Sequence, residues 1–490
     1  MQKIFNYLII ALLLVTTASS CKKWLDVTPG NQVRAEDQFT SEAGFRDALM
    51  GIYISMTDKG AYAKNISWGA LDFLAQPYRR AGSTSGFFEM QVYQYNTPGA
   101  MEIVEAMWKG NYNSISNINS ALDNLEKKKG VVHPISYSII KGELLGLRAF
   151  LHFDLLRLYG RSNFAGRPEL AGKPAIPYVT SFSKEVTPQL SYAKTFELME
   201  KDINEAAALL KEDPIYKNNN HPESYYAEVN RTGFFDNRHL RMNYYAVKAL
   251  QARVLLWQGS AAKMAEAATA ANEVITGSAA RLISADNPVK DVIMKSEFVF
   301  ALNIDRFYDI INFSLQPILT DDGVYMFETN YHTVYELNNT VGLSDFRQLN
   351  WFTDMGTADK TWVLRKLYQN AGNTETRNML PLMRISEMYY IMAEARMSTD
   401  LAESIELLNT VRRSRGIVQD IPSNADAQTV SGELTKEYQK DFVQEGQLFF
   451  YYKRRGFTSF FGLPANTTAN DLIYMLPYPD SEQGSGNREQ

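Results

Sequence analysis

The sequence is nearly devoid of cysteine, since Cys21 is the only one in 490 residues. A single cysteine cannot form an internal disulfide, which excludes a fold held together by such bridges. The chain also has only five histidines, which form no cluster, and it lacks a His-Glu-x-x-His motif. These absences leave a transition-metal site without its usual ligands, and we expect neither a metal nor another cofactor.

Long charged runs and long apolar runs are also missing. The formal net charge is −5 and no extended basic run occurs, so nucleic-acid binding is not expected. Beyond the N-terminal segment, no stretch is long and apolar enough to cross a membrane. The sequence contains neither a P-loop nor a Gly-x-Gly-x-x-Gly motif, and residues 82–86 have Thr84 where a nucleophile elbow has its serine. Asp321-Asp322-Gly323 is predicted to be a turn, because a calcium loop requires further acidic ligands at defined spacing.

The first 20 residues have the layout of a secretory signal. Lys3 supplies a positive charge, residues 4–15 are apolar apart from Asn6 and Tyr7, and residues 16–20 are small. The following Ala18-Ser19-Ser20-Cys21 resembles a lipobox, although Ala18 stands where such boxes usually have leucine. We predict removal of residues 1–20 and lipidation of Cys21, which would consume an otherwise free thiol, with residues 21–40 as lipid anchor and tether.

Residues 41–490 are predicted to form a single, mainly α-helical body. Apolar residues recur three or four positions apart in several segments, which places them on one helix face. The predicted helices cover residues 42–56, 107–127, 142–159, 192–211, 242–257, 263–276, 381–397 and 401–415. Gly160 is placed to cap the third of these. The last four form two helical hairpins that resemble tetratricopeptide units, which stack into a scaffold.

Two segments, 60–100 and 300–375, interrupt the helical pattern. Both mix aromatic residues with Gly, Ser, Thr, Asn and Asp, and neither has a sustained period. Irregular segments of this length are usually functional or disordered, and their aromatic content argues against disorder. The aromatic side chains either pack these loops onto the scaffold or form a binding surface.

Five stretches of the sequence are distinctive in their order, namely residues 148–160, 383–395, 408–416, 445–456 and 476–479. They resemble, in the same order, an RAxxxxxLxxxYG helix, an RxxExYLxxAEA helix, an LNxVRxRAG helix, an EGxRWFDLxRxG segment and a closing LPIP. These are the patterns of the SusD/RagB family of Bacteroidetes nutrient-binding lipoproteins, which the chain therefore resembles. One departure is Gln447-Leu448-Phe449-Phe450, which replaces the usual Arg-Trp-Phe-Asp and leaves the local hydrogen bonding open.

The resemblance implies a cell-surface protein of the outer membrane that works with a SusC-like TonB-dependent transporter. It implies capture of an oligosaccharide or a peptide without chemistry, at an aromatic arc drawn from the irregular segments. A sugar ring offers an apolar face to an aromatic side chain and hydroxyls to polar neighbours. The expected ligand-binding residues are Arg79, Arg80, Phe87, Phe88, Tyr93, Tyr95, Asn96, Asp305, Tyr308, Tyr325 and Trp351.

Two other functions are compatible with the sequence. A glycoside hydrolase would need two carboxyl groups facing each other across a cleft, and these need not be adjacent in the chain. Glu387 and Glu394 lie seven residues apart on one predicted helix, but buried ion pairs with Arg384, Arg412 or Arg415 are the expected explanation. A pure protein-interaction scaffold built from the helical pairs is the other alternative.

Overall fold

The computed structural model describes residues 35–219, 221–284, 291–370, 372, 375–486 and 488–489. The predicted signal segment 1–20 and the lipidation site Cys21 lie outside these residues, as does the tether up to residue 34. Within the described part of the chain, no helix is both long enough and apolar enough to span a membrane.

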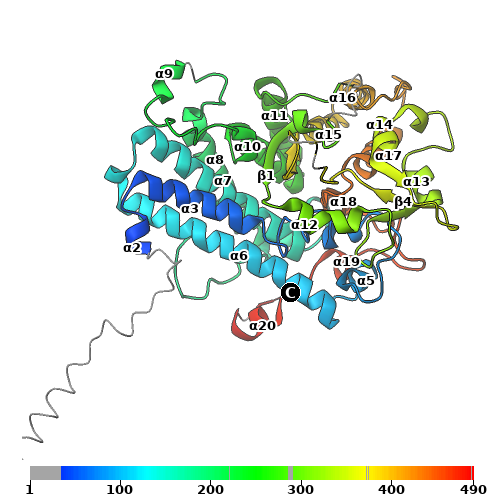
Figure 1. Ribbon diagram of the computed structural model, residues 1–490, viewed down its shortest axis with the longest axis horizontal. Coiled ribbons are helices and arrows are strands. Elements are labelled where there is room, and N and C mark those ends of the chain that lie inside the picture. The colour runs from blue at the N-terminus through cyan, green and yellow to red at the C-terminus, as the bar shows by residue number, and fades with distance from the viewer. Residues whose placement is uncertain are drawn as a thin grey trace, which may run out of the picture.

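Long helices packed side by side form the scaffold, which confirms the predicted mainly α-helical class. In Figure 1, α3, α6, α7 and α8 cross one half of the molecule, and the other half mixes helices with short strands. The long helices are α3 (Glu42–Met56), α6 (Pro98–Lys127), α7 (Pro134–Tyr159), α8 (Tyr192–Leu209), α10 (Tyr244–Gln258), α11 (Ala261–Gly277), α15 (Ile385–Arg396), α16 (Leu401–Ser414) and α17 (Ala427–Asp441).

The two predicted helical hairpins are present. Gly259 joins α10 to α11 with a φ of +68°, a conformation that glycine adopts without strain. Ser260 then caps α11, its side chain accepting a hydrogen bond from the Lys263 amide at 3.3 Å. The second hairpin, α15 and α16, packs its first helix against α11, so the pairs stack as tetratricopeptide units do.

Short elements fill the segments predicted to be irregular and also connect the long helices elsewhere in the chain. They are α2 (Ala35–Gln38), α4 (Ala70–Phe73), α5 (Gly86–Gln91), α9 (Glu223–Tyr226), α12 (Phe307–Ile311), α13 (Glu328–Val334), α14 (Phe346–Trp351), α18 (Gln447–Arg455), α19 (Asp471–Tyr474) and α20 (Asp480–Gly486). The strands are β1 (Phe298–Asn303), β2 (Tyr325–Phe327), β3 (Phe352–Asp354), β4 (Thr361–Leu364) and β5 (Met379–Arg384).

The strands form two small antiparallel sheets, β1–β5 and β2–β4–β3. In the first sheet Leu302 pairs with Leu380 and Asn303 with Met379. The prediction of helix from residue 381 is therefore wrong for residues 381–384, because this stretch finds backbone partners in a strand some 80 residues away. Helix begins only at Ile385.

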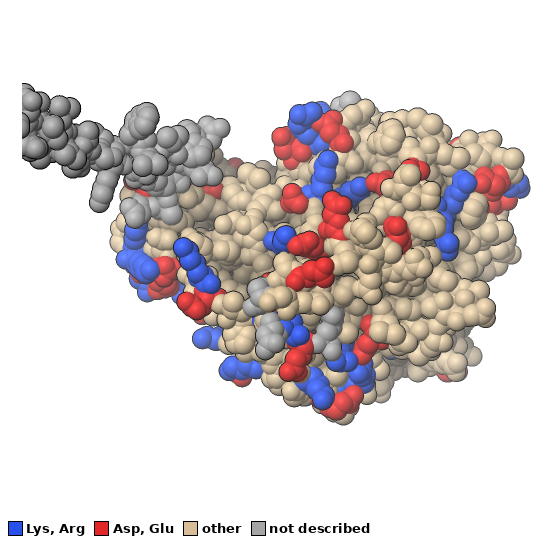
Figure 2. Space-filling model, turned by 90° about the horizontal axis from the view of Figure 1, so that it is seen from below, with Lys and Arg blue, Asp and Glu red and all other residues tan. Residues whose placement is uncertain are grey.

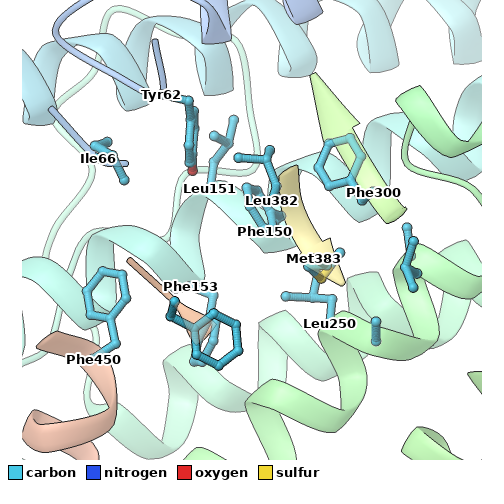
Figure 3. Packing of buried hydrophobic residues seen from close by; sticks show 14 of the residues in the cluster. Tyr62, Ile66, Phe150, Leu151, Phe153, Leu250, Phe300, Leu382, Met383 and Phe450 are labelled. Carbon is cyan, nitrogen blue, oxygen red and sulfur yellow. The ribbon is translucent and has the colours of Figure 1, made fainter. Parts of the chain in front are cut away.

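The core is continuous from the helical scaffold to the loop segments. Figure 3 shows Phe150 of α7 beside Phe300 of β1 and the β5 residues Leu382 and Met383, with Phe153 further along α7. Tyr62 from the 60–100 segment enters the same core, with its ring centroid 5.7 Å from that of Phe150. Burial of this apolar surface holds the irregular segments against the helices.

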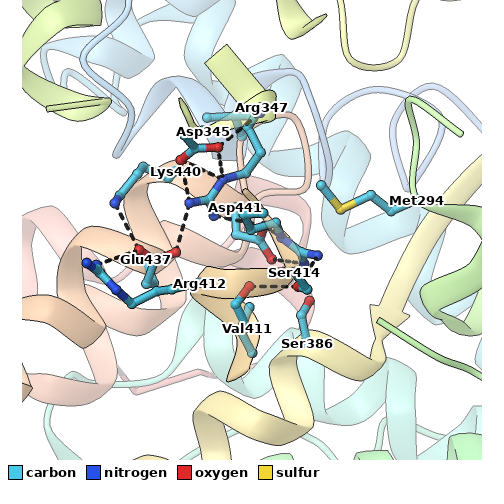
Figure 4. A network of polar contacts seen from close by, with 12 residues as sticks. Met294, Asp345, Arg347, Ser386, Val411, Arg412, Ser414, Glu437, Lys440 and Asp441 are labelled. Carbon is cyan, nitrogen blue, oxygen red and sulfur yellow. Dashed lines mark hydrogen bonds and ion pairs between the residues drawn. The ribbon is translucent and has the colours of Figure 1, made fainter. Parts of the chain in front are cut away.

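A network of fully buried charges joins the C-terminal helices to the loops. Asp441, at the end of α17, contacts the guanidinium groups of Arg347, Arg384 and Arg415 at 3.0–3.1 Å. Figure 4 shows the neighbouring part, where Arg347 also reaches Asp345 and Glu437. Although burial alone would raise the pKa of Asp441, the three guanidinium groups hold it well below its usual range.

The two glutamates of α15 are ion-paired, as predicted, but with other partners. Glu387 binds Arg253 of α10 at 2.5 Å, and Glu394 binds Arg454 of α18 at 2.6 Å. The predicted partners are used elsewhere, for instance Arg384, which contacts Glu297 at 2.9 Å. Sequence spacing identified the buried carboxylates but not the long-range contacts that neutralise them.

The departure at residues 447–450 is accommodated by Arg157 of α7. Its Nη1 donates a hydrogen bond to Gln447 Oε1 at 3.0 Å, and its guanidinium carbon lies 3.8 Å from the centroid of the Phe450 ring. Arg157 also forms an ion pair with Asp154 one turn earlier in α7. Arg157 therefore supplies the local contacts of this segment through a hydrogen bond and a cation–π contact.

Candidate functional site

The two irregular segments meet in the folded chain. The Arg79 amide donates a hydrogen bond to the Tyr325 carbonyl at 2.7 Å, and the Gly82 amide donates to the Asp321 carbonyl at 2.9 Å. Asn330 Nδ2 donates to the Pro77 carbonyl at 2.8 Å. Residues 77–82 therefore lie along residues 321–330 for most of their length.

Side chains reinforce this contact. Lys64 Nζ lies 2.7 Å from Asp322 Oδ2, and the Ser85 hydroxyl donates to the same carboxylate. At Gly82 an added Cβ would lie 1.9 Å from Asp321 Oδ1, so only glycine allows so close an approach. The Asp321-Asp322-Gly323 turn is thus held by donors from the first segment. Among the described residues, no group of three or more His, Cys, Asp or Glu side chains could hold a metal ion.

Four of the predicted ligand-binding residues are buried in the core. The exposed fractions are 2% for Phe87, 5% for Tyr95, 3% for Tyr325 and 0% for Trp351. Their polar atoms are also used internally: the Tyr95 hydroxyl donates to the Ile473 carbonyl at 2.7 Å, and Trp351 Nε1 donates to the Val292 carbonyl at 2.9 Å. These side chains were predicted to contact a ligand, but here their rings pack the loops onto the scaffold and expose almost no surface.

Arg80 and Phe88 remain accessible and lie together. Arg80 is exposed, Phe88 is half-buried, and the guanidinium carbon lies 5.4 Å from the ring centroid. Gln91 fixes the backbone beside them, accepting from the Ala81 amide at 2.8 Å. We call Arg80 and Phe88 the Arg80–Phe88 platform. It offers an aromatic surface next to a planar set of hydrogen-bond donors, the combination that a sugar ring requires.

Two further predicted residues lie near the platform but are tied to the fold. Arg79 pairs with Asp359 at 3.4 Å and lies over the Phe327 ring at 5.5 Å. Tyr93 is half-buried, and its hydroxyl donates to the Leu74 carbonyl at 2.8 Å. Burial raises the pKa of Tyr93, so the hydroxyl stays protonated and keeps this bond. Both residues support the meeting segments and leave little of their polar surface for a ligand.

The last three predicted residues are exposed but lie elsewhere. Asn96 lines a small cavity of about 50 Å³ beside the segment 477–480. Asp305 and Tyr308 flank the start of α12, and in the described residues neither has a hydrogen bond to the segment 60–100. The structure therefore groups Arg79, Arg80, Phe88 and Tyr93, but not Asn96, Asp305 or Tyr308, around the contact between the two segments.

A third segment, which the sequence-based prediction missed, joins this region. Residues 456–470 lie between α18 and α19 and contain no Asp, Glu, Lys or Arg. An added Cβ at Gly462 would lie 3.1 Å from the Pro77 Cα, so this segment packs directly against the first one. Phe461 is 37% exposed there. The signal available in the sequence was a charge-free run with two adjacent phenylalanines.

Exposed apolar side chains cluster in the second segment, at the apolar patch 308–319. Its members are Tyr308, Phe313, Ile318 and Leu319, which are 47%, 66%, 55% and 54% exposed. The Val324 amide donates to the Ser314 carbonyl at 3.0 Å, which places this stretch beside the strand that contacts Arg79. Figure 2 shows one face of the molecule on which wide areas carry no charged group. Exposed apolar clusters of this kind mark interaction surfaces.

Comparison with known proteins assigns the family. Residues 23–231 match a family described as SusD-like, "starch-binding associating with outer membrane", and residues 318–481 match the SusD family. The chain belongs to the SusD/RagB family. A SusD-like protein of Formosa agariphila is 25% identical over 175 residues, which cover 34% of this chain and only 32% of that protein. The chain thus matches about a third of that relative's length.

Solved structures of the family share the fold over nearly the whole chain. A SusD superfamily protein from Bacteroides thetaiotaomicron has a TM-score of 0.71 at 20% identity, covering 91% of this chain and 98% of its own. A SusD-like carbohydrate binding protein from Bacteroides vulgatus has a TM-score of 0.70 at 16% identity, with 91% and 97% covered. Surface glycan-binding protein A from Bacteroides thetaiotaomicron has a TM-score of 0.64 at 15% identity, covering 92% of this chain and 99% of its own.

Proposed function

We propose that this protein captures an oligosaccharide at the Arg80–Phe88 platform and passes it to a SusC-like TonB-dependent transporter. The observation that carries the proposal is the meeting of the segments 77–91 and 321–330, which leaves an arginine and an aromatic ring accessible at one place. Family membership supports the same role. One structural relative, surface glycan-binding protein A from Bacteroides thetaiotaomicron, is named for glycan binding.

The charges around the platform favour a glycan over a charged peptide. Arg79 is paired with Asp359, and Lys64 with Asp322, so these groups neutralise each other. Residues 90–101, 310–320 and 456–470 contain no charged side chain at all. A ligand at the platform would meet the Phe88 ring and the planar donors of Arg80, which suit the apolar face and the hydroxyl rim of a sugar.

We propose binding without cleavage. A glycosidase needs a carboxylic acid with a raised pKa that can reach the substrate. Burial raises the pKa of Asp72 to about 7, but this side chain is 1% exposed and accepts bonds from the Tyr78 hydroxyl and two backbone amides. It cannot approach a ligand on the surface. Asp321 and Asp322 are held by the first segment, as described above.

Replacing Phe88 with alanine is expected to weaken glycan binding by about tenfold, which corresponds to about 1.4 kcal/mol. The substitution removes the aromatic face and the support for Arg80, and it leaves the buried anchors Phe87 and Tyr95 in place. Binding would be measured by titration calorimetry against a panel of oligosaccharides and peptides, with product chromatography after long incubation.

The matched control for this experiment is Phe182→Ala, because Phe182 is 61% exposed on a loop outside the meeting segments. Its affinity should equal that of the unmodified protein. Equal affinities for Phe88→Ala and the unmodified protein would place the site elsewhere. If chromatography detects a shortened glycan, the protein is an enzyme and the capture proposal fails.

We further propose that a lipid on Cys21 holds the body at the outer membrane. The 14 residues from Cys21 to the first described residue, Ala35, can span at most about 50 Å when fully extended. That reach keeps the ligand site close to a membrane-embedded partner. The apolar patch 308–319 is the surface that we assign to this partner, because aliphatic side chains such as Ile318 and Leu319 suit a protein contact better than a sugar.

Replacing Cys21 with serine should release the protein from the membrane fraction while its glycan affinity stays unchanged. The reason is that serine cannot form the thioether, and the platform is separate from the tether. Fractionation followed by immunoblotting measures the first effect and calorimetry on the released protein measures the second. Retention of the serine variant in the membrane would show that the lipid is not the anchor.

A further inference from the structure

A cavity of about 710 Å³ lies at the open end of the first helical hairpin, where α10 begins and α11 ends. Its volume is in the range of small-molecule binding sites. None of its lining residues belongs to the segments 77–91 or 321–330. In Figure 1, α10 and α11 lie at the top of the molecule, whereas α5, which carries Phe88, lies at the lower right. The cavity is therefore separate from the platform. We call it the α10–α11 cavity, and its walls include Ile215, His239, Tyr245, Ser278, Lys295 and Phe298.

Two polar atoms on the wall of this cavity are buried and have no hydrogen-bond partner among the described residues. They are Ser278 Oγ, on a residue that is only 4% exposed, and His239 Nε2. The Ser278 amide donates to the Val274 carbonyl at 3.1 Å, so the end of α11 fixes the backbone while the hydroxyl stays unengaged. Buried polar groups of this kind are costly unless a bound molecule forms hydrogen bonds with them.

The polar groups of the wall can both donate and accept. The Ser278 hydroxyl does so by turning about one bond. Burial and, to a smaller extent, the Lys295 ammonium lower the pKa of His239, so its ring is neutral at pH 7 with one donor and one acceptor nitrogen. The Tyr245 hydroxyl accepts from the Lys217 amide at 3.2 Å and keeps its own proton, since burial raises its pKa. A sugar hydroxyl has the same dual character, whereas a carboxylate only accepts and an ammonium group only donates.

The charged groups at the cavity are already occupied or exposed to solvent. Arg238 is neutralised by Asp213, whose carboxylate lies 2.5 Å from its Nη2. Both oxygens of Asp291 accept backbone amides, at 2.6 Å and 3.0 Å. Lys295 Nζ donates to the Glu375 carbonyl at 3.1 Å, and the Glu375 side chain is exposed, where solvent screens its charge. No excess of positive charge attracts an anion, and the carboxylates present do not converge on a cation.

We propose that the α10–α11 cavity is a second ligand site, which binds a neutral monosaccharide or disaccharide. The dual-character groups would meet its hydroxyls, and the apolar wall formed by Ile215, Phe298 and Val299 would meet the face of the ring. The inference shares with the proposed function only the class of ligand. It does not require that the platform binds a glycan, since the two sites have no residue in common.

Saturation-transfer NMR with glucose, galactose, mannose and xylose, each added alone, tests the proposal. We expect at least one of these sugars to bind the unmodified protein. Ala279→Trp should weaken that binding by about tenfold, because Ala279 is exposed and lines the cavity, so the indole ring fills the space without displacing buried packing. Ala265→Trp is the matched control, since Ala265 is exposed on the same helix but outside the lining, and its affinity should be unchanged.

Ser278→Ala gives a second measurement that does not depend on a bulky substitution. It should weaken sugar binding by about fivefold, the usual effect of one lost hydrogen bond, without lowering the melting temperature, because the hydroxyl has no partner in the described protein. A lower melting temperature with unchanged affinity would mean that the hydroxyl holds a structural water molecule, and would overturn the proposal.

Phe88→Ala distinguishes this site from the platform. Monosaccharide binding should persist in that variant; its loss would mean that the sugar binds only at the platform, and would overturn the second site. Absence of binding by all four sugars, or equal affinities for Ala279→Trp and the unmodified protein, would overturn it too. If Ala279→Trp loses the monosaccharide while Phe88→Ala keeps full oligosaccharide affinity, the second site is supported and the platform proposal fails.

Discussion

Replacing Asp441 with asparagine is expected to lower the free energy of unfolding by about 3–5 kcal/mol, which is the usual cost of removing one partner from a buried ion pair. Asp441 Oδ1 accepts from Arg347 at 3.1 Å and from Arg415 at 3.0 Å, and Oδ2 accepts from Arg415 at 3.2 Å. Asparagine keeps one acceptor oxygen, but its amide nitrogen is a donor and would face the guanidinium donors. The three arginines would also lack one negative charge.

Chemical denaturation followed by circular dichroism measures this loss. The matched control is Glu406→Gln, which breaks an exposed ion pair with Arg413 and should cost less than about 1 kcal/mol. A loss at Asp441 as small as that of the control would mean that water or neighbouring carboxylates compensate the arginines. The network would then contribute little to the stability of the C-terminal half.

Much of the scaffold could be predicted from the sequence because amphipathic helices carry a local period. The bounds of α3 were predicted correctly, since one face of that helix is exposed. The start of α7 was placed eight residues too late, because this helix is buried on nearly all sides and its first turns show no clear period. Gly160 does end α7, but its φ is −81°; glycine is needed because a Cβ would approach the Leu156 carbonyl oxygen within 2.5 Å.

The meeting of the segments that form the candidate site was predictable, but the exposure of individual side chains was not. Composition identified two aromatic-rich loops, and they do meet. Which aromatic rings face solvent depends on contacts between residues far apart in the chain, such as the bond from Tyr95 to Ile473. Phe87 and Phe88 are adjacent in sequence, yet one is buried and the other is half-buried. No local pattern distinguishes them.

The stability contributed by Asp72 is expected to increase as the pH falls from about 7 to about 4. Burial raises the pKa of Asp72 from 3.8 to about 7 in the folded chain. Between these values the folded state holds a proton that the unfolded state has released, so folding is favoured by lower pH and disfavoured as the pH rises through 7. The expected slope is about 1.4 kcal/mol per pH unit.

Asp72→Asn isolates this titration, because asparagine resembles the protonated acid and carries no charge at any pH. The variant should be more stable than the unmodified protein at pH 8, and the two should converge near pH 4. Denaturation curves at several pH values give the difference directly, and titrations that both proteins share cancel from it. A difference that does not change with pH would show that Asp72 is ionised throughout.

The same variant separates stability from ligand capture. Asp72 lies in α4 and accepts from the Gln444 amide at 2.7 Å and from the Gly446 amide at 3.2 Å, so it fixes the base of the segment that ends in the platform. Because its side chain is buried, Asp72→Asn should leave glycan affinity unchanged at pH 5.5 and at pH 8. A variant that binds more tightly at pH 8 alone would mean that the buried charge loosens α4 and, with it, Arg80 and Phe88.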